Sequence, residues 1–103
     1  MNVNVIESSK ACADLRRILD YFIGQQEDTV ASRFLDAYEE TLGSIADFPE
    51  LASTWESDVP RLNSLRVKLI RGFEKYLVFF RLVEQTAYVV RVVHGHQNLD
   101  NVL

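Results

Sequence analysis

The sequence has 103 residues, 48% of them hydrophobic and 25% charged, and a formal net charge of −4. This length and apolar content suit one hydrophobic core, so we expect residues 1–103 to form a single domain. No apolar stretch approaches the ~18 residues of a membrane span, and no basic leader precedes an apolar run. A single cysteine, Cys12, excludes an internal disulfide. These features favour a cytoplasmic protein without a membrane partner.

Charge divides the chain into two unlike halves. Residues 1–60 carry four basic and twelve acidic side chains, a balance of −8, whereas residues 61–103 carry seven basic and three acidic, a balance of +4. We expect two electrostatically different surfaces, although acidic helices and exposed arginines on strands would give the same division without a partner.

The N-terminal segment predicts a strand followed by a helix. Residues 3–7 are β-prone, as in a short strand. Ser8 or Ser9 can cap a helix over about residues 9–23, where apolar side chains recur at three- and four-residue steps. Gly24 is expected to close this helix in the left-handed conformation.

A second amphipathic helix is expected after a short link. Asp28 or Thr29 can cap it, and Pro49 ends it because proline disfavours helical geometry in the preceding residue. The two helices would form an antiparallel hairpin. Residues 50–63 form one long connection. Within it, Trp55 is interpreted as a lid over the core, the alternative being an exposed binding anchor.

From residue 65 onward the hydrophobic period changes to two. Residues 65–70, 76–83 and 87–93 predict three strands, because β-branched and aromatic side chains dominate them. Residues 71–74 and 84–86 are expected to turn the chain. The sequence therefore predicts an α+β fold with an antiparallel meander behind a helical hairpin.

Alternation along the strands predicts which side chains share a face of the sheet. One face is almost wholly apolar and is expected to cover the hairpin: Leu65, Val67, Leu69, Tyr76, Val78, Phe80, Leu82, Tyr88, Val90 and Val92. The other face is expected to mix four cations with four apolar side chains: Arg66, Lys68, Leu77, Phe79, Arg81, Val89, Arg91 and Val93. Such a mixture suits an anionic partner, either RNA phosphates or acidic protein side chains. The alternative is a set of solubilising residues on a wet face.

Motifs of most familiar enzymes are absent. The sequence has no P-loop, no dinucleotide-binding glycine pattern, no serine-hydrolase elbow and no paired-cysteine zinc motif. His94 and His96 are a weak metal signal without further ligands. We therefore expect no cofactor and no metal.

Several loose motifs follow one another in a specific order: ADLRRI at 13–18, IADFP at 45–49, LR at 65–66, YLVFFR at 76–81 and RVVHG at 91–95. In this order they resemble the RelE/ParE superfamily of bacterial type II toxin–antitoxin modules. The resemblance implies a βααβββ fold, with a helical hairpin packed on a mainly antiparallel four-stranded sheet. It also implies a cognate antitoxin that wraps the toxin, and growth inhibition once the antitoxin is degraded.

The two branches of this superfamily differ in function. RelE-like members cleave messenger RNA in the ribosome, whereas ParE-like members are regarded as inhibitors of DNA gyrase and are not nucleases. Leu77 stands where RelE-like chains tend to place an arginine, no arginine or lysine follows Gly95, and no tyrosine follows Tyr88. The sequence therefore favours a ParE-like toxin that acts on DNA gyrase.

We expect this toxin to have a partner-binding face that comprises Arg66, Lys68, Leu77, Phe79, Arg81, Arg91, His94 and His96. The antitoxin is expected to cover apolar side chains such as Leu77 and Phe79, or to lie along the helical hairpin. The alternative is an endonuclease acting on messenger RNA at the ribosome, for which Arg81, Arg91, His94 and His96 would stabilise phosphate charge and move protons. A further alternative is a non-toxic binding module of the same fold.

Overall fold

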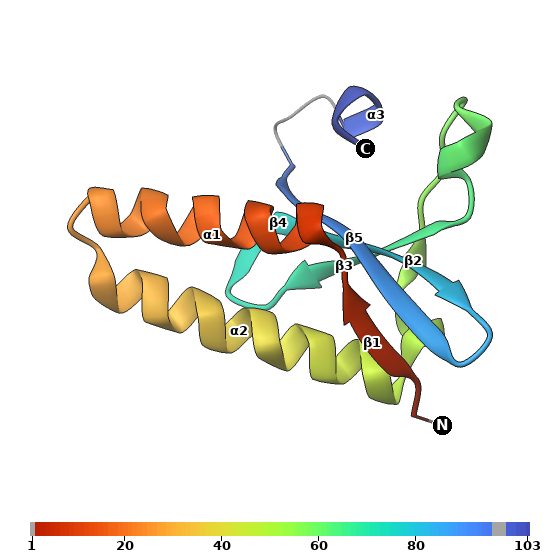
Figure 1. Ribbon diagram of the computed structural model, residues 1–103, viewed down its shortest axis with the longest axis horizontal. Coiled ribbons are helices and arrows are strands. Elements are labelled where there is room, and N and C mark those ends of the chain that lie inside the picture. Colours follow the sequence, from red (N-terminus) through yellow and green to blue (C-terminus); the bar gives the residue numbers. More distant parts are fainter. Residues whose placement is uncertain (1, 96–98) are drawn as a thin grey trace.

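The computed structural model describes residues 2–95 and 99–103. Within these residues a five-stranded sheet runs in the order β1-β5-β4-β3-β2, with β1 parallel to β5 and the other pairs antiparallel. Figure 1 shows α1 and α2 side by side as a hairpin. The elements are β1 (Asn4–Glu7), α1 (Ser9–Gly24), α2 (Asp28–Asp47), β2 (Ser53–Thr54), β3 (Leu65–Ile70), β4 (Phe73–Val83), β5 (Thr86–His94) and α3 (Leu99–Val102).

The α+β architecture predicted from the sequence is confirmed, with one strand more than expected. The additional strand is β2, whose two residues pair with β3. It lies in the connection of residues 50–63, which also holds 3-10 turns at Pro49–Leu51 and Pro60–Leu62. A two-residue strand carries too little alternation to be recognised by its period.

Local side-chain chemistry explains where the helices begin and end. The Ser8 hydroxyl accepts a hydrogen bond from the amide of Ala11 at 3.0 Å, as predicted for a capping serine. The prediction for Gly24 was wrong, since α1 includes this residue and the left-handed backbone occurs at Gln26, with φ 60°. At the start of α2, Asp28 is already helical, and no side chain caps this end.

Both faces of the sheet are buried, which the sequence did not indicate. The hairpin face packs under α1 and α2, where the rings of Phe22, Phe34, Phe73 and Tyr76 lie with centroids 5.1–6.3 Å apart. The opposite face, called here the outer face, carries a second cluster that residues from the long connection and from α3 cover. This outer cluster comprises Leu62, Leu65, Phe79 and Val93, with Trp55, Val59, Val67, Leu77, Val90, Leu99, Val102 and Leu103 packed against them.

Trp55 illustrates how the outer cluster is closed. Its indole is half-buried and meets the ring of Phe79 edge-on, with centroids 5.2 Å apart. The interpretation of Trp55 as a lid is confirmed, but the surface it covers is the outer face rather than the hairpin face.

The predicted faces of β3 were wrong by one residue. Arg66 pairs with Phe80, and Lys68 pairs with Val78. Directly paired residues share a face, so the two cations lie on the hairpin side, while Leu65 and Val67 point to the outer face. Ile70 has the same parity as Arg66 and Lys68, and it enters the main core on the hairpin side.

The predicted faces of β5 were correct only for its second half. A register shift at Phe79/Phe80 separates the pairs Phe79–Arg91 and Phe80–Val89. Such a bulge leaves one extra residue in β5. The residues of β5 that precede it therefore point to the opposite face from the one that simple alternation predicts. Arg91, Val92 and Val93 therefore face as predicted, whereas the faces of Tyr88, Val89 and Val90 are exchanged.

One partly buried hydrogen bond ties α2 to β1 and predicts a pH dependence of stability. The Tyr38 hydroxyl donates to Glu7 Oε1 at 2.6 Å. Burial, and next this hydrogen bond, raise the pKa of Tyr38 above its usual value. The folded chain thus holds this proton more tightly than the unfolded chain does. The resulting stabilisation is complete below about pH 10 and is lost as the pH rises further.

We therefore expect Tyr38→Phe to flatten the alkaline decline of stability. Above pH 10, Tyr38 should lower the free energy of unfolding by up to about 1.4 kcal/mol per pH unit, and the phenylalanine variant should lack this part of the slope. Urea denaturation at several alkaline pH values measures it. Tyr88→Phe, at an exposed tyrosine of β5, is the control and should keep the slope. Equal slopes in the Tyr38→Phe variant and the parent would contradict the expectation.

Candidate partner-binding surface

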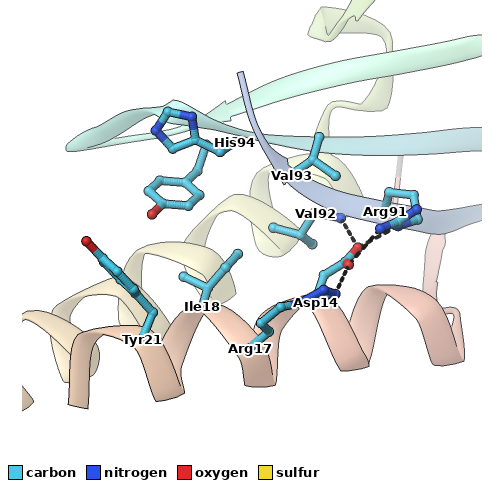
Figure 2. A pocket seen from close by; sticks show the side chains of 9 residues that line it. Asp14, Arg17, Ile18, Tyr21, Arg91, Val92, Val93 and His94 are labelled. Carbon is cyan, nitrogen blue, oxygen red and sulfur yellow. Dashed lines mark hydrogen bonds and ion pairs between the residues drawn. The ribbon is translucent and has the colours of Figure 1, made fainter. Parts of the chain in front are cut away.

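A buried carboxylate of α1 organises the free edge of β5. Strand β1 pairs with β5 only as far as Val89, so the edge beyond it has no strand neighbour. Asp14, 3% exposed, fills this gap by accepting from the amide of Val92 at 2.9 Å. The same carboxylate accepts from Arg91 Nε at 2.7 Å, from Arg91 Nη2 at 2.9 Å and from Arg17 Nη2 at 2.8 Å (Figure 2). Asp14 therefore satisfies a backbone donor that would otherwise be orphaned.

Arg91 extends this network to the C-terminal segment. Its Nη1 donates to the backbone oxygen of Val102 at 2.6 Å, so one side chain joins β5, α1 and α3. Its pKa is raised above the usual value, chiefly by the hydrogen bonds to Asp14 and against the effect of burial. Arg91 is thus a charge already neutralised within the chain.

A pocket of about 370 Å³ lies beside this network, on the hairpin side of β5. His94 pairs with Tyr76, and the two rings meet edge-on with centroids 5.0 Å apart. Burial, and next the proximity of Tyr21, raise the pKa of Tyr76. Figure 2 shows Tyr21 and His94 at the same pocket as Arg17 and Arg91, so aromatic and charged side chains both line this hollow.

The residues predicted to form one partner-binding face are divided between the two faces of the sheet. Leu77, Phe79, Arg81 and Arg91 lie on the outer face. The other described members, Arg66, Lys68 and His94, lie on the hairpin side, and His96 falls outside the described residues.

Burial changes what each outer-face residue can do. Phe79 is fully buried under Trp55 and the C-terminal residues, so it packs the chain's own core. Leu77 is half-buried. Arg81 lies at the surface, where Nε donates to Ser64 Oγ at 3.0 Å and Nη2 to the backbone oxygen of Arg61 at 2.8 Å.

The structure adds two cations that the sequence analysis did not assign to the site. Lys10 and Arg61 line a pocket of about 360 Å³ together with Arg81 and Arg91; this hollow is called here the basic pocket. Lys10 belongs to the acidic half of the chain and Arg61 to the long connection. No motif links them, because only the tertiary structure brings the start of α1 and the Pro60–Leu62 turn to the same pocket.

Two features are absent from the described part of the chain. No helix there has the length and apolar character needed to cross a membrane. Nor do three or more His, Cys, Asp or Glu side chains of residues 2–95 and 99–103 gather as a metal site.

Comparison with known proteins identifies the family. A family model described as "ParE toxin of type II toxin-antitoxin system, parDE" matches residues 5–99. A solved structure titled "Chromosomal ParDE TA system from P. aeruginosa" has the same fold, with a TM-score of 0.73 and 17% sequence identity over 89% of this chain and 95% of that chain. No curated protein sequence matches this one. The chain therefore belongs to the ParE toxin family of type II toxin–antitoxin systems.

Proposed function

We propose that this chain is a cytoplasmic toxin that inhibits DNA gyrase and is neutralised by a cognate antitoxin. Its family and the likeness to a chain of a ParDE system support a toxin with an antitoxin partner. The choice of gyrase over messenger RNA depends on one observation, the separation of the groups that a nuclease would need.

Three described side chains carry that observation. Acid–base cleavage of RNA needs a proton-transferring group and cations around one phosphate. Here Arg81 lies on the outer face and His94 on the hairpin side, next to Tyr76. Arg91 is neutralised by Asp14. An inhibitor that binds a protein target needs no such convergence, so the arrangement favours the ParE-like activity.

We place the contact with gyrase on the outer face and the C-terminal residues. Leu77 and Arg81 are accessible there, and α3 lies over the same cluster. An antitoxin that covered this surface would block gyrase by direct competition.

Supercoiling by purified gyrase tests the proposal directly. We expect the chain to abolish the supercoiling of relaxed plasmid DNA, and prior mixing with the antitoxin to restore it. Undisturbed supercoiling at a large molar excess of the chain would contradict gyrase inhibition. Primer extension on translated messages tests the nuclease alternative, which new cleavage ends would support against our proposal.

A further inference from the structure

The basic pocket combines an apolar floor with a ring of cations. Leu62, Leu65 and Val90 form its floor, and Ser8 and Ser9 of the α1 N-terminus lie at its wall. The cations around it are Lys10, Arg61, Arg81 and Arg91. None of the described residues that line it is acidic. The pocket thus offers burial for an apolar group and positive charge for an anionic one.

Three of these four cations form no ion pair with a described side chain. In the described residues Arg91 is paired with Asp14, whereas Lys10, Arg61 and Arg81 form no ion pair. Arg81 donates to a serine hydroxyl and to a backbone oxygen, and Arg61 Nη1 donates to the backbone oxygen of Leu103 at 2.9 Å. The serine hydroxyl and the backbone oxygen of Arg61 are neutral acceptors, so they orient the Arg81 guanidinium without neutralising it.

The arginines also retain hydrogen-bond donors. A guanidinium has five N–H groups in a planar fork, and the bonds named above use one donor of Arg61 and two of Arg81. The remaining donors suit a carboxylate, which a guanidinium can bind through two parallel hydrogen bonds. Because the side chains are already held in place, binding would cost little further ordering.

We propose that the basic pocket receives acidic side chains of the antitoxin, carried on a segment whose apolar residues contact Leu62, Leu65 and Val90. This inference rests on the proposed function, because it requires an antitoxin. Charge favours a peptide over a nucleic acid here. The chain carries −4 overall and −8 in residues 1–60, which repels an extended polyanion, whereas a short acidic segment meets only the local cations.

Peptide binding to the full chain tests the proposal. The probes are short, overlapping, fluorescein-labelled peptides that tile the protein encoded by the reading frame beside this gene. We expect an acidic, partly apolar peptide to bind, and its anisotropy-derived Kd to rise about tenfold or more with Arg61→Ala or Arg81→Ala, since charged hydrogen bonds are lost. Lys10→Ala should have a smaller effect, because its ammonium is a point charge without the planar fork of an arginine.

Controls separate charge recognition from folding. Arg33→Ala removes an exposed cation of α2 that does not line the basic pocket, and it should leave Kd unchanged. Arg81→Ala removes contacts to Ser64 and Arg61, so circular dichroism must show that it folds. Lys10→Glu, at a residue whose side chain forms no hydrogen bond or ion pair in the described structure, should weaken binding without this risk. A peptide with lysine in place of its acidic residues should bind the Arg61→Glu variant better than the parent chain, because the charges of both partners are then exchanged.

Several outcomes would overturn the proposal. One is an unchanged Kd in the arginine variants. Another is equal binding of peptides in which asparagine and glutamine replace the acidic residues. A third is that none of the overlapping peptides binds. Binding of a polyuridine oligonucleotide in place of the peptides would assign the pocket to nucleic acid. Gyrase inhibition is a separate readout, so its failure alongside intact peptide binding would contradict the target and leave the pocket assignment standing.

Discussion

Asp14→Ala is expected to lower the free energy of unfolding by about 3–5 kcal/mol, because removing one member of a buried ion pair leaves the other uncompensated. The carboxylate is 3% exposed and accepts from Arg91, Arg17 and the amide of Val92. Its loss leaves a backbone donor of β5 without its acceptor. It also frees the guanidinium that holds α3 through Val102.

The reverse truncation should cost less. Arg91→Ala leaves Asp14 with Arg17 and the amide of Val92, and the arginine side chain is already 19% exposed. The double variant should be less destabilised than the sum of the two single effects, because both remove the same interaction. Urea denaturation measures each variant.

Asp20→Ala is the matched control for Asp14→Ala. Asp20 is an exposed acid of the same helix, so its replacement should change the free energy of unfolding by no more than about 0.5 kcal/mol. An Asp14→Ala variant as stable as this control would show that the network contributes nothing to folding.

The sequence predicts the elements of this protein better than it predicts the faces of its strands. Helical periodicity and the capping serine locate α1, and β-branched runs locate β4 and β5. A bulge inserts one residue without any signal in composition, and one residue is enough to invert a strand. In β5 this exchanged Tyr88, Val89 and Val90, while the residues after the bulge faced as predicted.

The site was harder to predict because both faces of the sheet are apolar. For β3, alternation predicted that Leu65 and Val67 face the hairpin, because the hairpin was the cover that helical periodicity indicated. The long connection and α3 provide a second cover, so these residues point outward and Arg66 and Lys68 point to the hairpin side. Lys10 and Arg61 join the basic pocket through tertiary packing alone, which no local pattern records.

Phe79 shows how the cover on the outer face changes the function that is expected of a residue. The sequence analysis treated it as an apolar side chain that an antitoxin would cover, since an exposed apolar residue beside cations marks a partner surface. In the structure it is fully buried, beneath Trp55 and beside Val93. Its neighbour Phe80 is equally buried, but on the hairpin side.

We therefore expect Phe79→Ala to lower the free energy of unfolding by about 3–5 kcal/mol, as deleting a buried aromatic ring does. Phe80→Ala should cost about as much by the same mechanism. Trp55 is the only tryptophan of the chain, so its fluorescence separates the two variants. In the folded state its emission should shift to the red in Phe79→Ala, which removes the ring that the indole contacts, and should stay unchanged in Phe80→Ala.

A different result for Phe79 would restore the expectation from sequence. If Phe79 were an exposed partner residue, its replacement would change stability by no more than about 0.5 kcal/mol and would weaken only the binding of the antitoxin. Large destabilisation together with the red shift would instead mean that the outer cluster belongs to the toxin's own core. A partner would then reach this face only at its accessible margin, through Leu77, Arg81 and the basic pocket.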